Sequence, residues 1–162
     1  MRSFIGVDYK LREVSMAILS HESEGAVTLS TGSMKVPEGL PTPDTLHALG
    51  GRTEALIQHL LLVSGAKHAD VAVCMVEEPG GKRHNHTIMA QGIIMAALAG
   101  QGFTVVSYPV TSWKKATVGK GDASKDEVRQ YVKNSLGYGI KKEDENDAAA
   151  IADCAYRTTS YG

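Results

Sequence analysis

Three short apolar runs open the chain, at residues 3–7, 14–20 and 26–36, and polar residues separate them. Runs of this length are typical of β-strands, and the third run alternates between apolar and polar positions. Because only short connections separate the runs, the pattern predicts three strands in an antiparallel meander.

The pattern changes to that of a helix after a Pro-Thr-Pro sequence. Apolar residues recur at helical spacing from Leu46 to Leu61, and the predicted helix ends at Gly65. Gly50 and Gly51 lie inside this helix, and they mark the place where it can kink.

Two later segments are apolar nearly throughout. Residues 71–76 are apolar at every position, which is typical of a strand covered on both faces, and their place after a helix favours a parallel crossover. Residues 86–99 predict a helix that is apolar nearly all round, so it must be covered on more than one side. Burial in the core of one chain explains this helix, and a contact between two copies of the chain is the second explanation.

The remaining elements complete an α/β pattern. Residues 103–108 predict a further strand, and Ser124 with Glu127 predicts a capping box at the start of a helix. A last helix begins near Glu143. The order of the elements predicts one α/β domain over residues 1–162, with a five-stranded mixed sheet flanked by helices.

Composition excludes several classes of protein. Hydrophobic residues make up 43% of the chain and charged residues 22%, which is typical of globular domains rather than of disordered or fibrous chains. The longest apolar stretch, residues 92–100, is well short of the about 20 residues that a membrane span needs. The first residues lack an apolar signal core, and Cys74 and Cys154 do not make a disulfide framework. We therefore expect a reduced, cytoplasmic protein.

The net charge of −1 conceals a segregation of charge along the sequence. Residues 79–142 carry 10 basic and 3 acidic side chains, whereas both flanking segments have an excess of acids. A basic segment of this kind can attract a polyanion such as a nucleic acid. An ordinary solvated face has the same pattern, so charge alone leaves both interpretations open.

Acidic residues lie where predicted strands end and where the last helix begins. Asp8 follows the first strand, and Glu77 and Glu78 follow the fully apolar one. Asp144 and Asp147 are three residues apart, which places them on one face of the last helix. If the first and fourth strands are parallel neighbours, their carboxyl ends share a crevice into which that helix face can point. Carboxylates gathered in this way need a cation, and oxygen ligands select Mg²⁺ or Mn²⁺.

Each of these acids also fits an ordinary structural role. A strand-terminal acid is often a turn residue, and acids in a first helical turn interact well with the helix dipole. Only their joint placement favours a metal site. Strand alternation does not decide between Glu77 and Glu78, because both faces of the preceding strand are apolar.

The sequence resembles the RuvC-type Holliday junction resolvases of the RNase H-like superfamily over most of its length. FIGVD at residues 4–8 and VCMVE at residues 73–77 resemble the two acidic strands of that family, and residues 90–110 resemble its central helix and the strand after it. KKATVGKGDASKDEV and DENDAAAIADCAY are the most specific segments. The family's positions in them are filled by Lys114, Thr117, Gly119, Gly121, Lys125, Asp144 and Asp147.

The resemblance implies an RNase H-like fold and a Mg²⁺-dependent endonuclease that nicks four-way DNA junctions, with Mn²⁺ as a substitute ion. It implies that Asp8, Glu77 and Asp147 hold the metal ions, and it favours Glu77 over Glu78. Asp144 then completes the ligand set or orients the attacking water. Lys125, at the start of a helix, is the residue that we expect to stabilise the negative charge of the transition state.

DNA contacts are expected along the basic segment. The candidates are Lys114, Lys115, Lys120, Lys125, Arg83 and His84, with the backbone amides of Gly119 and Gly121 beside them. A nucleotide cofactor is not expected, because GKGDASK lacks the spacing of a phosphate-binding loop. Symmetric cleavage of a junction needs two active sites, so the resemblance implies a homodimer whose seam is the helix at residues 86–99.

Two departures from the family lie next to the candidate site. Tyr9 and Lys10 stand where the family usually has Pro-Gly, and residues 79–81 stand where it has a DNA-wedging aromatic. Such divergence would suit a phage-encoded member, acting in the host cytoplasm. Two alternatives remain open at this point: an RNase H-like nuclease for other branched DNA or for RNA, and a junction-binding protein without catalytic activity.

Overall fold

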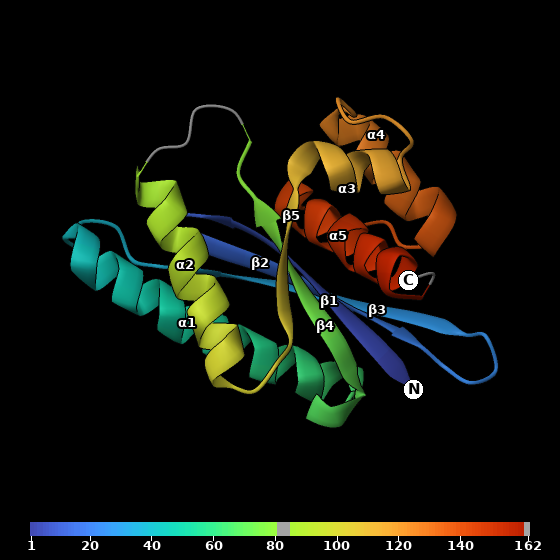
Figure 1. Ribbon diagram of the computed structural model, residues 1–162, viewed down its shortest axis with the longest axis horizontal. Coiled ribbons are helices and arrows are strands. Elements are labelled where there is room, and N and C mark those ends of the chain that lie inside the picture. The colour runs from blue at the N-terminus through green and yellow to red at the C-terminus, as the bar shows by residue number, and fades with distance from the viewer. Residues whose placement is uncertain (81–84, 161–162) are drawn as a thin grey trace.

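Five strands form a single sheet in a computed structural model that describes residues 1–80 and 85–160 (Figure 1). The strand order is β3-β2-β1-β4-β5. The strands are β1 (Arg2–Lys10), β2 (Glu13–His21), β3 (Val27–Lys35), β4 (Val71–Glu78) and β5 (Val105–Pro109). The first three pair antiparallel, and β4 runs parallel to both β1 and β5. The predicted meander, the parallel crossover and the mixed sheet are therefore confirmed.

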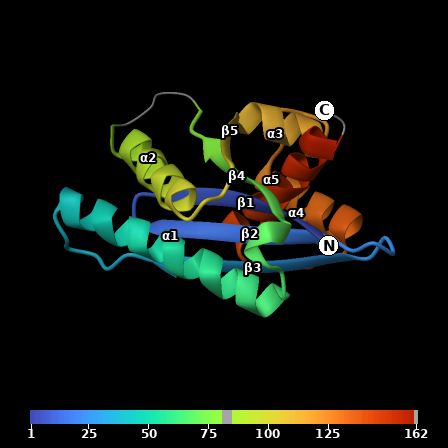
Figure 2. The ribbon, with the colours of Figure 1, turned by 60° about the horizontal axis from the view of Figure 1, so that its bottom comes forward.

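The helices cover both faces of the sheet (Figure 2). They are α1 (Thr42–Ser64), α2 (Asn85–Gly100), α3 (Val110–Thr117), α4 (Lys125–Tyr131) and α5 (Glu143–Ser160), with short turns η1 (His68–Asp70) and η2 (Val132–Leu136). One buried cluster joins α1 and α2 to the sheet, and a second joins α3, α4 and α5 to its other face. No helix within the described ranges combines the length and the apolar character needed to cross a membrane.

Strand β1 contributes to both clusters by simple alternation. Ile5 and Val7 belong to the cluster under α1 and α2, whereas Phe4 belongs to the cluster under α5. Gly6 faces α5 as well: a Cβ atom there would lie 2.0 Å from the carbonyl oxygen of Ala148. Helix α5 therefore lies directly on β1, and only glycine allows this approach.

Helix α1 runs without a break through Gly50 and Gly51. A Cβ at Gly50 would lie 3.2 Å from Cγ2 of Ile93, so this glycine serves the packing of α2 against α1. Strand β5 begins at Val105 rather than at residue 103, because Phe103 leaves the strand pattern to pack into the first cluster. The capping box of Ser124 and Glu127 is confirmed at the start of α4.

Candidate active site

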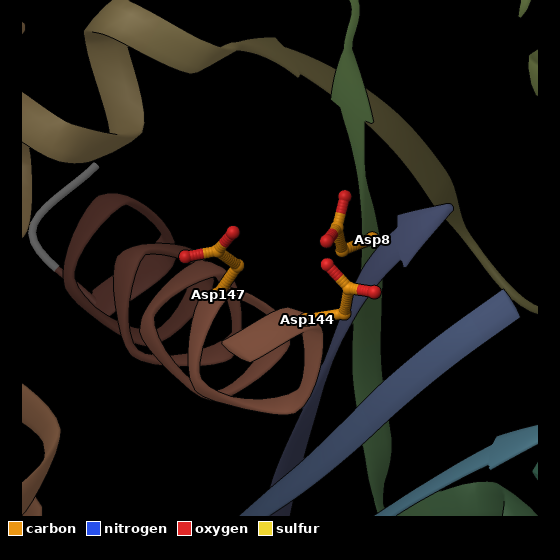
Figure 3. Close-up of side chains that lie close together, drawn as sticks. All are labelled: Asp8, Asp144 and Asp147. Atoms are coloured by element: carbon orange, nitrogen blue, oxygen red, sulfur yellow. The ribbon is translucent and has the colours of Figure 1, made fainter. Parts of the chain in front are cut away.

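Three carboxylates meet at the carboxyl end of β1. Asp8, Asp144 and Asp147 each offer an oxygen atom, and these atoms all lie within 4.8 Å of one another. Figure 3 shows Asp8 on the strand and the two other side chains on α5, all directed into one space. The predicted convergence of the strand-terminal acid with the acids of the last helix is therefore present.

The close packing of α5 on β1 explains why these residues meet. Asp8 lies two residues after Gly6, so it points to the same face of the sheet as the glycine that contacts α5. The first turns of α5 lie over this end of the strand. Asp144 and Asp147 are one helical turn apart and face the strand together.

The start of α5 is held in place by its other polar residues. Glu145 reaches β3, where it accepts hydrogen bonds from Thr31 Oγ1 at 2.6 Å and from Ser33 Oγ at 3.0 Å. Asn146 is buried, and its Nδ2 donates to the carbonyl oxygen of Ile140 at 2.8 Å. These bonds fix the helix end that carries the two aspartates.

Glu77 lies near these aspartates at the end of β4, but it does not belong to the group whose oxygens lie within 4.8 Å of one another. Val76 is the register partner of Val7, so the next residues along the two parallel strands are Glu77 and Asp8. Glu77 has the same strand parity as Met75, which lies in the cluster under α5, whereas Glu78 has the opposite parity. The side chain of Glu77 accepts a hydrogen bond on Oε2 from Nε1 of Trp113 at 2.8 Å.

Burial and mutual repulsion raise the pKa values of most of this group. Burial raises the pKa of Asp8 well above its ordinary value, and the charges of Glu77, Asp147 and Asp144 add to the effect. Burial likewise raises the pKa of Glu77, against the hydrogen bond from Trp113, and raises that of Asp147 to about 6. Carboxylates that destabilise one another in this way form a site that a divalent cation would neutralise.

Asp144 differs because a lysine compensates its charge. Burial alone would raise the pKa of Asp144. Its hydrogen bond and ion pair with Lys10, together with a hydrogen bond to Glu13 and the charge of Lys125, outweigh burial and lower it. Lys10 Nζ lies 3.1 Å from Asp144 Oδ2. Lys10 belongs to the pair of residues that departs from the family pattern, so this ion pair is one consequence of that departure.

Two of the expected lysines lie near the carboxylates. Lys125 Nζ is 3.0 Å from Glu143 Oε2, and its charge also lowers the pKa of Asp147. The charge of Lys114, in the last turn of α3, lowers the pKa of both Glu77 and Asp147.

The other expected DNA contacts lie further out. Lys115 is exposed, and Lys120 forms an ion pair of 2.5 Å with Glu127. The amide of Gly119 donates to the carbonyl oxygen of Lys114 at 3.2 Å, so it caps α3 and is not the open phosphate-binding amide that was expected. Arg83 and His84 lie outside the described residues.

The sequence interpretation missed the parts played by Trp113 and Lys10. Trp113 is fully buried, and its hydrogen bond to Glu77 was not predicted. Its indole N–H was the overlooked signal, because a buried tryptophan needs a hydrogen-bond acceptor. Lys10 has the same strand parity as Asp8, and this alternation was the signal for its contact with the site.

The donor set fits a hard divalent cation. The candidate ligand atoms of Asp8, Asp144 and Asp147 are all carboxylate oxygens. They come from β1 and α5, which pack against each other. Mg²⁺ and Mn²⁺ prefer such oxygen ligands, whereas zinc favours nitrogen and sulfur.

Comparison with known proteins gives consistent matches over most of the chain. The family described as "Crossover junction endodeoxyribonuclease RuvC" matches residues 4–155. RuvC of Bordetella avium is 28% identical over 157 residues, covering 95% of this chain and 83% of that protein. RuvC of Chloroflexus aggregans is 29% identical over 156 residues, covering 93% and 90%. The structure of T. thermophilus RuvC in complex with Holliday junction substrate has a TM-score of 0.76 at 18% identity, covering 99% of this chain and 96% of that one.

Proposed function

The chain belongs to the family of RuvC crossover junction endodeoxyribonucleases, and we propose that it nicks four-way DNA junctions at the carboxylate cluster. The convergence of Asp8, Asp144 and Asp147, with Glu77 beside them, carries the proposal. A protein that only binds junctions has no use for a buried Asp8 among like charges, because such a group costs stability. A metal-dependent nuclease needs this arrangement.

The cluster would hold divalent ions, with Mg²⁺ as the proposed ion and Mn²⁺ as its substitute. Asp8, Glu77 and Asp147 are the proposed ligands, and Asp144 either completes the set or orients the attacking water. When bound, a pair of such ions stabilises the attacking and the leaving oxygen of a phosphodiester displacement. The carboxylates keep the ions in place at the carboxyl ends of the two central strands.

Lysines would bind the DNA backbone around the cluster. Lys125 and Lys114 lie near enough to the carboxylates to lower the pKa of Asp147. We assign to Lys125 the stabilisation of negative charge on the phosphate in the transition state, with its ammonium exchanging Glu143 for a phosphate oxygen. Lys114, Lys115 and Lys120, with Arg83 and His84, would contact the flanking phosphates.

A homodimer would supply the two active sites that symmetric nicking needs. Helix α2 is the proposed seam. Its residues Ala90, Ile94 and Leu98 are buried in the monomer, whereas Ile88 and Met89 are 45% and 48% exposed. Large apolar side chains exposed side by side mark a surface for association. Light scattering on the wild type and on Ile88→Asp tests this: a dimer that the substitution dissociates supports the seam, and a monomeric wild type rejects it.

We take residues 1–162 as one nuclease domain. We place its activity in the cytoplasm, or in the host cytoplasm for a phage-encoded chain, because the DNA substrate is there.

The function is tested with four-way, forked and linear DNA and with RNA, each with Mg²⁺. We expect symmetric nicks in the four-way junction from the wild type. We expect Asp8→Asn to bind the junction with similar affinity and to leave it intact.

Each other outcome would reject a specific part of the proposal. Unchanged nicking by Asp8→Asn rejects the cluster as the active site. Junction binding by the wild type without metal-stimulated nicks indicates a binding protein. Equal cleavage of forks or RNA indicates a nuclease of broader specificity.

A further inference from the structure

Trp113 joins the hydrophobic core to the proposed metal site. Its side chain is 0% exposed and lies in the buried cluster that contains Met75 and Ala148. Its one polar atom, Nε1, donates a hydrogen bond of 2.8 Å to Oε2 of Glu77. Trp113 comes from α3 and Glu77 from the end of β4, so this bond links two elements across the edge of the site.

The chemistry of the indole fixes which partner donates in this hydrogen bond. An indole N–H is only a donor, and it neither gains nor loses a proton at ordinary pH. It therefore holds the glutamate oxygen in the same way with or without a cation nearby. If the carboxylate turned away, the buried donor would be left without this partner, which is costly.

The bond also gives the two carboxylate oxygens of Glu77 different roles. Oε2 accepts the hydrogen bond from the indole N–H, so we assign the binding of a cation to Oε1. Groups that hydrogen-bond to a metal ligand orient it, and their removal typically lowers metal affinity about 10- to 100-fold.

We propose that Trp113 is a positioning residue for the metal site, which fixes Glu77 so that a single oxygen atom faces the divalent ion. This inference rests on the proposed function, since it requires Glu77 to be a ligand. Trp113 itself touches neither ion nor DNA in this role, and it acts only through the carboxylate.

Phenylalanine is the informative substitution, because Trp113→Phe removes the donor and keeps most of the aromatic bulk. We expect the affinity for Mn²⁺, measured by titration calorimetry without DNA, to fall about 10-fold. Val128→Ala is the matched control. Val128 is also 0% exposed and belongs to the same buried cluster, so its truncation loosens the packing without touching Glu77. We expect this control to keep the wild-type affinity for Mn²⁺.

A double substitution separates positioning from packing. In a Glu77→Ala background, Trp113→Phe should change the Mn²⁺ affinity no further, since the side chain that it orients is gone. Trp113 is the only tryptophan, so its fluorescence gives a second readout. Addition of Mg²⁺ should shift the emission of the wild type and leave that of Asp8→Asn unchanged.

The outcomes distinguish this inference from the proposed function. Wild-type protein that binds no Mn²⁺ overturns the metal assignment and with it the inference. Equal Mn²⁺ affinity in the wild type and Trp113→Phe overturns the inference alone. An equal loss of affinity in Val128→Ala, or a further loss on adding Trp113→Phe to Glu77→Ala, would also overturn it, because packing would then explain the effect.

Discussion

Gly6 of β1 and Ala148 of α5 approach so closely that a Cβ atom on Gly6 would lie 2.0 Å from the carbonyl oxygen of Ala148. This contact sets the distance between the strand that carries Asp8 and the helix that carries Asp144 and Asp147. The site therefore depends on a residue without a side chain. The neighbouring atoms are backbone atoms of a helix, so they have little freedom to move away.

Gly6→Ala should damage stability and metal binding together. The added methyl group must push α5 away from β1, and overpacking of this kind typically costs about 1–3 kcal/mol or more. Urea unfolding and Mn²⁺ calorimetry measure the two effects. Gly51→Ala is the control, since a Cβ there meets nothing within 4 Å and alanine favours the helix. Wild-type stability in Gly6→Ala would contradict the described contact.

Asp147→Asn should stabilise the metal-free protein at neutral pH. The pKa of Asp147 is about 6 in the fold against an ordinary 3.8, so the folded chain holds this proton more tightly than the unfolded chain. The contribution of Asp147 to stability is therefore highest below the lower value, and it falls as the pH rises towards the upper one.

The expected gain for Asp147→Asn at neutral pH is on the order of 2 kcal/mol, after allowing for partial solvent screening. It should nearly vanish at about pH 3, where both states carry the proton. Urea unfolding in the presence of a chelator at both pH values measures this. A variant less stable than the wild type at neutral pH would show that the carboxylate is stabilising rather than strained.

Glu77→Gln and Glu78→Gln should differ sharply in nicking. The charge of Glu77 acts on Asp8, and Glu78 has the opposite strand parity. Glu77→Gln removes a charged metal ligand, so it should lower the nicking rate by more than the about 100-fold that is typical when a hydrogen-bond partner of a ligand is lost. Glu78→Gln should change the nicking rate only a few-fold. Single-turnover cleavage of a four-way junction compares them, and a larger loss in Glu78→Gln would reverse the assignment.

Lys115→Ala should weaken junction binding in a salt-dependent way. The side chain is exposed in the last turn of α3, on the helix that also supplies Lys114. Removing one phosphate contact lowers the slope of log affinity against log salt by about 1. Lys67→Ala is the control, because Lys67 is exposed just before β4, at the end of that strand opposite Glu77. Equal slopes in both variants and the wild type would exclude Lys115 from the DNA interface.

The strands and helices could be predicted from the sequence, because alternation and helical spacing are local patterns. The parallel pairing of β1 with β4 followed from one fully apolar strand after a helix, and it brought Asp8 to the end of Glu77's strand. The choice between Glu77 and Glu78 could not come from the pattern, because β4 is buried on both faces. That choice depends on which face α5 covers.

The contacts made by long side chains could not be predicted from the sequence pattern. Trp113 reaches Glu77 from a separate helix, and Lys10 reaches Asp144 across the space between a strand end and α5. Strand alternation places Lys10 on the same face as Asp8, but the partner of each side chain depends on tertiary packing. The amide of Gly119 shows the opposite error, since a glycine-rich turn suggested phosphate binding and the amide instead caps α3.

Anomalous diffraction from crystals of the protein grown with Mn²⁺ tests whether these acids together bind a divalent cation. We expect a Mn²⁺ peak within about 2.2 Å of oxygens of Asp8 and Asp147, with Glu77 or Asp144 in the same coordination shell. The peak should disappear in Asp8→Asn. An empty cluster at saturating Mn²⁺, or a peak that persists in Asp8→Asn, would show that these carboxylates do not form a metal site.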